Sequence, residues 1–299
     1  MNIKLPKGFK LGHADNKTTG VTVILASPKT VGGVSVRGCA PGTRETDLLK
    51  PEKAVQEINA IALCGGSAFG LAACDGVIRY LSENNIGYSV GLHKVPLVAG
   101  AVIFDLKEKL DYPTSDMGYQ ACKNAADKNL KFGSIGAGTG ASVGKIMGLA
   151  FSQKGGIGAS TVEVGSVFVT AITVCNAVGD VVDYKTSKII AGVHDGSGNH
   201  LGTANIIMAG AAKTDVGANT TLTCLVTNVK LTKLQANKLA DIAHNGYAKS
   251  INPVHTDYDG DTIFALSSGE LDFDFTALSV MAVEAICQSV VNAVSAEKY

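Results

Sequence analysis

The sequence of 299 residues contains no tryptophan, and aromatic residues make up only 6% of it. It also lacks an excess of either charge, because 26 lysine and arginine residues balance 26 aspartate and glutamate residues. A balanced charge favours neither nucleic acid nor an anionic membrane as a partner. The six histidines show no metal-ligand spacing, and no HExxH or CxxC motif occurs. We therefore expect no metal ion.

Long apolar runs are missing as well. The first ten residues have no apolar core of the kind found in a signal peptide, and no uninterrupted run is long enough to cross a membrane. The cysteine count of seven is odd, and most cysteines lie within apolar runs, at positions 39, 64, 74, 122, 175, 224 and 287. This pattern indicates buried free thiols in a reducing compartment, so we expect a cytoplasmic protein.

Apolar residues, at 46%, and the 35 glycines are abundant, which suits a large core of closely packed layers with tight turns. Periodicity predicts strands and helices that alternate irregularly along the chain. Strands are expected at 21–26, 60–63, 101–106, 157–165, 166–178, 221–229 and 261–266, and helices at 67–82, 115–128, 232–250 and 275–294. A surface loop is expected at 185–202. Buried strands with helices outside predict a layered α/β sandwich that forms one domain over residues 1–299.

The Asn219–Thr220 bond joins a turn of small residues to a β-branched, apolar run. A threonine hydroxyl is a weak nucleophile that needs a base, and a chain-terminal threonine has its own α-amine as that base. Such an amine titrates near about 7.7–8.0, where a general base is most effective. Cutting this bond would therefore create a catalyst at the start of a strand. An ordinary strand after a turn, or a glycosylation acceptor at Asn219, would have the same sequence.

Two acidic residues, Asp259 and Asp261, are separated only by Gly260, directly before a predicted strand. In an extended chain, residues two apart point to the same side, so the two carboxylates could together hold an ammonium and a hydroxyl. The glycine spacing does not fit a calcium-binding EF-hand loop. A polar turn with an Asx cap is the alternative interpretation.

A strand, a turn and a helix are expected around residues 65–70, as in a nucleophile elbow. The match to GxSxG fails because Phe69 occupies the last glycine position. The backbone N–H groups at Gly66 and Ser67 could bind a carboxylate or an oxyanion at the helix N-terminus. A plain helix cap explains the segment equally well.

Two polar residues border apolar segments further along the chain. Lys154 precedes a glycine turn, and Asn176 lies within an apolar strand, where a buried amide needs hydrogen-bond partners. A solvated lysine and a structural asparagine are the plain interpretations. Residues 136–141 match the dinucleotide fingerprint GxGxx(G/A) only loosely, since no clear helix and no suitably placed acidic residue follow. We therefore expect a structural glycine turn there.

Taken together and in order, these segments resemble one family. The matching segments are residues 20–25, 36–46, 63–71, 136–140, 154–158, 219–222 and 255–264. They resemble the N-terminal-nucleophile peptidases typified by L-aminopeptidase D-Ala-esterase/amidase, the β-aminopeptidases and the nylon-oligomer (6-aminohexanoate-oligomer) endohydrolases. The resemblance implies a four-layered αββα sandwich. It also implies self-cleavage into fragments 1–219 and 220–299 that stay together.

The resemblance further implies a role for each matching residue. Thr220 would be the nucleophile and would form an acyl-enzyme, with its α-amine as the base. Asp259 and Asp261 would orient the amine and the hydroxyl, and Lys154 would hold the charge of the network. Asn176 would donate to the oxyanion, and one such donor is worth roughly 3–4 kcal/mol. By the same resemblance, Tyr119 would correspond to a pocket tyrosine of the family, with Gly66 and Ser67 as further pocket residues.

The activity implied is hydrolysis of a small peptide or oligoamide by a homo-oligomer, a dimer or a tetramer, without metal or cofactor. The Asn-Thr junction and the Asp-Gly-Asp triplet are more similar to the nylon-oligomer branch than to the aminopeptidases. Two alternatives remain open at this point. One is acyl transfer of the ornithine acetyltransferase type, and the other is a non-enzymatic binding role with an uncut chain.

Overall fold

The computed structural model describes residues 3–108, 110–211 and 219–295. Two five-stranded sheets form its centre. The first has the order β1 (Lys10–Asp15), β2 (Gly20–Leu25), β5 (Ala60–Cys64), β8 (Val98–Val102) and β4 (Thr43–Arg44). The second has the order β11 (Gly156–Val164), β12 (Val167–Asn176), β15 (Thr220–Val229), β17 (Thr262–Leu271) and β3 (Val31–Val36). Both are mixed: β5 runs parallel to β8 and β15 parallel to β17, while their other pairings are antiparallel.

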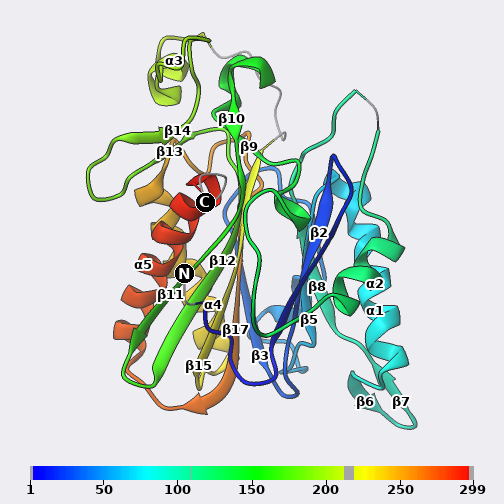
Figure 1. Ribbon diagram of the computed structural model, residues 1–299. Helices are drawn as coiled ribbons and strands as arrows, with labels where there is room; N and C mark the ends of the chain where they lie inside the picture. Colours follow the sequence, from blue (N-terminus) through cyan, green and yellow to red (C-terminus); the bar gives the residue numbers. More distant parts are fainter. Residues whose placement is uncertain (1–2, 109, 212–218, 296–299) are drawn as a thin grey trace.

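The helices cover the outer faces of the two sheets. Helices α1 (Ala73–Glu83) and α2 (Ser115–Lys123) lie against the first sheet, and α4 (Lys233–Ser250) and α5 (Phe275–Ser295) against the second (Figure 1). This is the four-layered αββα sandwich that the resemblance predicts. Smaller elements are α3 (Thr203–Met208) and the short strands β6 (Tyr88–Val90), β7 (His93–Val95), β9 (Ser142–Val143), β10 (Gln153–Lys154), β13 (Asp180–Val182), β14 (Ile189–Ala191) and β16 (Ile251–Asn252).

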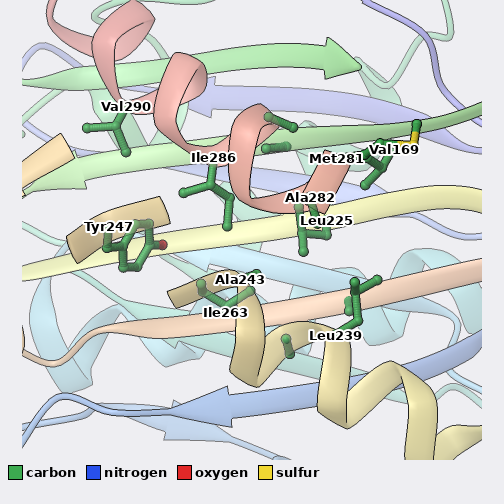
Figure 2. Packing of buried hydrophobic residues seen from close by; sticks show 14 of the residues in the cluster. Val169, Leu225, Leu239, Ala243, Tyr247, Ile263, Met281, Ala282, Ile286 and Val290 are labelled. Carbon is green, nitrogen blue, oxygen red and sulfur yellow. The ribbon is translucent and has the colours of Figure 1, made fainter. Parts of the chain in front are cut away.

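Three apolar clusters correspond to the three interfaces between the layers. Between the sheets, Ile61 and Leu63 of the first sheet meet Val174, Leu222 and residues around them in the second. Outside the first sheet, β2, β5 and β8 pack against α1 and α2. Outside the second, apolar residues of the strands pack against apolar residues of α4 and α5 (Figure 2). The strands contribute Val169, Leu225 and Ile263, and the helices contribute Leu239, Ala243, Met281, Ala282, Ile286 and Val290. Burial of these side chains is the main stabilising contribution.

Strand β15 is central to the second sheet and is buried along all ten of its residues. It pairs with β12 on one side and with β17 on the other. A strand buried on both faces reads as a continuous apolar and β-branched run, which explains its sequence. Because β15 begins at Thr220, the predicted cleavage point lies at the edge of a rigid central strand.

Local signals explain where several elements begin and end. The predicted capping box is present at α4, where Thr232 and Gln235 satisfy each other's backbone N–H groups. The helix expected from 67 starts as a 3-10 turn, Ser67–Ala72, and Ser67 has φ 51° with no side-chain cap at this end. The helix expected to reach 128 stops at Lys123, because Ala126 turns back to form two backbone hydrogen bonds with Leu11.

Two further expectations differ from the structure. The strand expected at 101–106 is β8, which begins earlier, at Val98, alongside β5. The expected loop 185–202 contains β14, which pairs with β13. Helix α5 is long and apolar enough to pass a test for a membrane span, but it is largely buried against the second sheet as a core helix. All seven cysteines are unpaired, and only Cys39 is exposed.

Candidate active site

The Asn219–Thr220 junction lies in the protein interior, at the start of β15. Asn219 is fully buried and Thr220 is 3% exposed. Thr220 is paired with Asn176 of β12, and its hydroxyl donates a hydrogen bond to the Asn219 carbonyl oxygen. The predicted nucleophile therefore already contacts the carbonyl group of the bond that it would attack. Water is largely excluded from this bond, which strengthens the electrostatic effects around it.

The loop that precedes β17 runs beside this junction. The Gly260 N–H donates to the Asn219 carbonyl oxygen at 2.9 Å, and the Asn219 N–H donates to the Tyr258 carbonyl at 3.2 Å. A Cβ at position 260 would lie 2.8 Å from the Thr220 hydroxyl oxygen and 2.6 Å from the Ala40 carbonyl oxygen. Only glycine therefore lets the backbone approach so closely. The sequence analysis noted Gly260 only as a spacer, but its N–H polarises the scissile carbonyl.

The two acidic residues of the triplet are both buried beside the junction, Asp259 at 1% exposure and Asp261 at 0%. Asp259 accepts hydrogen bonds from the Thr256 hydroxyl at 2.6 Å and from the Val178 N–H at 3.3 Å. Asp261 accepts from the Thr221 N–H at 2.7 Å. In the uncut chain Asp261 binds the backbone directly after Thr220, whereas the Asp259 side chain binds Thr256 and Val178. Burial, together with the nearby charge of Asp261, raises the pKa of Asp259 to about 6.

Asn176 is buried on the strand beside Thr220, as predicted, and its partners are all accounted for. Its Oδ1 accepts from the Ser142 N–H at 3.1 Å and from the Lys145 amine at 2.8 Å, and its Nδ2 donates to the Phe104 carbonyl at 3.0 Å. The Lys145 amine also donates to the Asn176 carbonyl at 2.9 Å. The hydrogen bonds described for Asn176 therefore organise the site. The backbone group described as donating to the Asn219 carbonyl is the Gly260 N–H.

The lysine beside Asn176 is Lys145, whereas the sequence analysis assigned this place to Lys154. Lys154 is exposed in β10, and its amine donates to the Thr139 carbonyl at 2.6 Å. Lys145 follows Gly144, which has φ 71°, and the tight turn there directs its side chain into the interior. Sequence reasoning missed Lys145 because nothing in Gly-Lys-Ile-Met marks a buried amine.

Burial lowers the pKa of Lys145 to about 7, while the negative charges of Asp259 and Asp105 act in the opposite direction. A lysine that is partly neutral at neutral pH can accept a proton, as a general base must. Asp105 is a second buried carboxyl near this amine that the sequence analysis did not single out. Burial raises its pKa, and hydrogen bonds and the charge of Lys145 act against that shift.

Gly66 and Ser67 lie at the predicted strand-to-helix turn, but their N–H groups are already used. The Gly66 N–H donates to the Asp105 carboxylate at 2.6 Å, and the Ser67 N–H donates to the Ile103 carbonyl at 2.9 Å. The carboxylate expected at this helix start is thus one of the chain's own. Through Asp105, the turn at Gly66 is connected with the surroundings of Lys145.

The structure places Tyr119, matched above to the family's pocket tyrosine, at the contact between α2 and α1. Its hydroxyl donates to Glu83 at 2.6 Å, and its ring packs edge-on against Tyr80, 5.7 Å away between centroids. The Arg79 guanidinium lies over the same ring at 4.5 Å. These partners belong to α1, on the far side of the first sheet from Thr220. Helical spacing gave a face for Tyr119 but could not tell which neighbour that face would meet.

Within the described ranges, no group of three or more histidine, cysteine, aspartate or glutamate side chains is arranged to hold a metal ion. The site contains two donors to the Asn219 carbonyl, which are the buried Thr220 hydroxyl and the Gly260 N–H. It also contains the carboxylates of Asp259 and Asp261 and the amine of Lys145, whose pKa is lowered. These are the components of nucleophilic acyl chemistry.

The αββα layers are those of the N-terminal-nucleophile hydrolase fold. The solved L-aminopeptidase D-Ala-esterase/amidase of Ochrobactrum anthropi, described as a variant of that fold, superposes with a TM-score of 0.71 over 98% of this chain and 87% of its own, at 18% identity. A Burkholderia β-aminopeptidase gives a TM-score of 0.68 over 97% and 84%, also at 18% identity. At these identities, the likeness establishes the fold.

Sequence comparison establishes the family. The chain belongs to Peptidase family S58, whose pattern matches residues 7–298. An uncharacterised aminopeptidase of Mycobacterium leprae is 40% identical over 272 residues, which cover 86% of this chain and 73% of that protein. A 6-aminohexanoate-oligomer endohydrolase of Agromyces sp. is 31% identical over 278 residues, which cover 90% and 75%. The chain is therefore a hydrolase that acts on amide bonds.

Proposed function

We propose that this chain cuts its own Asn219–Thr220 bond and that the freed Thr220 is the nucleophile of the mature hydrolase. The observation that carries the proposal is the contact of the Thr220 hydroxyl with the Asn219 carbonyl, to which the Gly260 N–H also donates. A positioned nucleophile and a preorganised donor on the same carbonyl are the two requirements for acyl transfer.

Self-cleavage follows from the groups around the bond. The Thr220 hydroxyl oxygen bonds to the Asn219 carbonyl carbon, and its proton passes to the neutral amine of Lys145. The carbon–nitrogen bond then breaks, and the Thr220 nitrogen takes up that proton, which leaves an ester between the two residues. Water hydrolyses the ester to a carboxylate on Asn219 and a free hydroxyl and α-amine on Thr220. Gly260 stabilises the negative charge on the oxygen in both steps.

Turnover of a substrate repeats this chemistry with the α-amine as the base. The amine takes the hydroxyl proton as Thr220 attacks the substrate carbonyl, and it later activates water to release the acyl group. Asp261 holds the backbone beside the nucleophile through the Thr221 N–H, and Asp259 binds Thr256 and Val178. Fragments 1–219 and 220–299 stay associated after the cut, because β15 of the small fragment lies between β12 of the large one and its own β17.

The substrate class that we propose is a small peptide or a linear oligoamide, in line with the relatives named aminopeptidase and oligomer endohydrolase. Asp105 favours attack near a free amino end. Its buried carboxyl, which lies near Lys145, could pair with the ammonium group of a substrate. We further propose that the protein acts in the cytoplasm, in keeping with its unpaired cysteines, and as a homo-oligomer.

Substitution at Thr220 tests the proposed function, with its buried neighbour Thr221 as the matched control. Thr220→Ala should give an uncut and inactive chain, whereas Thr220→Ser should retain part of both activities because the hydroxyl remains. Thr221→Val should cleave and turn over like the wild type, since the Thr221 N–H that Asp261 binds is kept. Wild-type hydrolysis of amino-acid anilides or aminohexanoate oligomers by Thr220→Ala would disprove the assignment.

A further inference from the structure

His255 lies against the carboxylate that holds the chain beside the nucleophile. Its ring Nδ1 is 2.8 Å from Asp261 Oδ2, and its backbone N–H donates to the same oxygen at 3.3 Å. The other oxygen of Asp261 accepts the Thr221 N–H at 2.7 Å. One fully buried carboxylate therefore joins His255 to the residue that follows Thr220. The side chain of His255 is 19% exposed.

For two neighbouring histidines, His244 and His255, the hydrogen-bond partners show which ring nitrogen carries a proton. A carboxylate only accepts, so His255 carries its proton on Nδ1. His244 Nε2 is 3.2 Å from the Ser35 carbonyl oxygen and must be the protonated nitrogen of that ring. The rings of His244 and His255 meet edge-on, with centroids 4.8 Å apart. Within the described residues, His244 Nδ1 and His255 Nε2 are buried without a partner.

The surroundings keep His244 uncharged. Burial lowers its pKa to about 4, and the neighbouring His255 acts in the same direction. The other titratable and charged groups that face the pair are Asp261, the Tyr247 ring 6.1 Å from His255, and Arg37 with Asp241 beside His244. Asp259 lies close enough to Asp261 for the two charges to interact. Among the described residues, the hydrogen-bond partner of the His255 ring is Asp261.

We propose that His255 is a positioning residue that holds Asp261 in the orientation in which it accepts the Thr221 N–H, so that Thr220 stays in line with the Asn219 carbonyl. This inference rests on the function proposed above. A hydrogen bond to a charged group is worth about 10–100-fold in an equilibrium constant. Without the His255 donor, the Asp261 carboxylate would lose one of the contacts that keep it aligned with the Thr221 N–H.

The backbone at position 255 offers clean variants. His255 has φ 56°, a region that glycine and asparagine tolerate well. His255→Gly removes the donor without adding backbone strain and leaves a partly open space of imidazole size. His255→Asn keeps an N–H donor at the same number of bonds from the backbone as Nδ1. His13→Ala, at a histidine of the first sheet that bonds Thr22, controls for the loss of a partly buried histidine elsewhere.

The experiment follows self-cleavage on denaturing gels after cell-free synthesis. We expect His255→Gly to cleave about 10–100-fold more slowly than the wild type. Added imidazole should restore the rate, and His255→Asn and His13→Ala should match the wild type.

An unchanged rate in His255→Gly would overturn the inference. So would an equal slowing of His255→Gly and His255→Asn that imidazole does not rescue, because that result indicates structural support alone. If His255→Gly does not fold, as judged by circular dichroism, the comparison of His255→Gln with His255→Asn decides in the same way. A wild-type chain that stays uncut would instead refute the proposed function itself.

Discussion

The close approach of Gly260 to the scissile bond makes Gly260→Ala the most specific perturbation of the site. The added methyl group would lie 2.8 Å from the Thr220 hydroxyl oxygen and 2.6 Å from the Ala40 carbonyl oxygen, both shorter than real Cβ contacts. The loop or the hydroxyl must therefore move by several tenths of an ångström. Such a shift misaligns the Gly260 N–H on the Asn219 carbonyl, and losing one donor of this kind costs about 10²–10³ in rate.

We therefore expect Gly260→Ala to slow self-cleavage at least about 10²-fold. Gly269→Ala is the matched control at the far end of β17, where the added methyl group meets open space but φ is +76°. Its strain costs about 1–2 kcal/mol of stability without touching the site. The assay is the time course of cleavage on a denaturing gel, with thermal unfolding measured for each variant. Cleavage of Gly260→Ala at the wild-type rate, or equal slowing of both variants, would refute the reasoning.

Three further outcomes are expected. Lys145→Met should slow self-cleavage at least about 10²-fold on the same gels, whereas Lys154→Met should stay within about threefold of the wild type. The reverse result would assign the role of the base to Lys154. The rate of wild-type self-cleavage should fall as the pH drops below about 7, because Lys145 takes up a proton there and can no longer act as a base. It should fall more steeply below about 6, where Asp259 is protonated too. A rate that does not change between pH 5 and pH 8 would contradict these roles. Asp105→Asn should raise KM for substrates with a free amino end and leave N-acetylated substrates unaffected, and an equal effect on both would exclude the ammonium contact.

The sequence predicted those features that local chemistry determines. The β-branched run of β15, the capping box of α4 and the position of Asp261 at the start of β17 all follow from neighbouring residues, and the structure confirms each of them. The order of the segments identified the family, because several short motifs in a fixed order are far more specific than any one of them. The four layers followed from that resemblance.

The sequence could not predict which distant groups meet. Lys145 and Lys154 both lie near glycines, and only the turn after Gly144 decides that Lys145 is the buried amine beside Asn176. The sequence also could not show where Tyr119 lies, because periodicity does not reveal that its face of α2 meets α1. Gly260 looked like a spacer because a backbone N–H has no signature in a sequence. These features depend on tertiary contacts between segments far apart in the chain.

The central claim is that Thr220 becomes a chain terminus, and N-terminal sequencing of the purified protein, combined with its intact mass, tests it most directly. The account predicts two polypeptides that remain together in native chromatography and separate under denaturing conditions. The smaller one should begin Thr-Thr-Leu-Thr, at Thr220, and the larger one should end at Asn219. A single polypeptide with the mass of the uncut chain after prolonged incubation, alongside full hydrolytic activity, would contradict it.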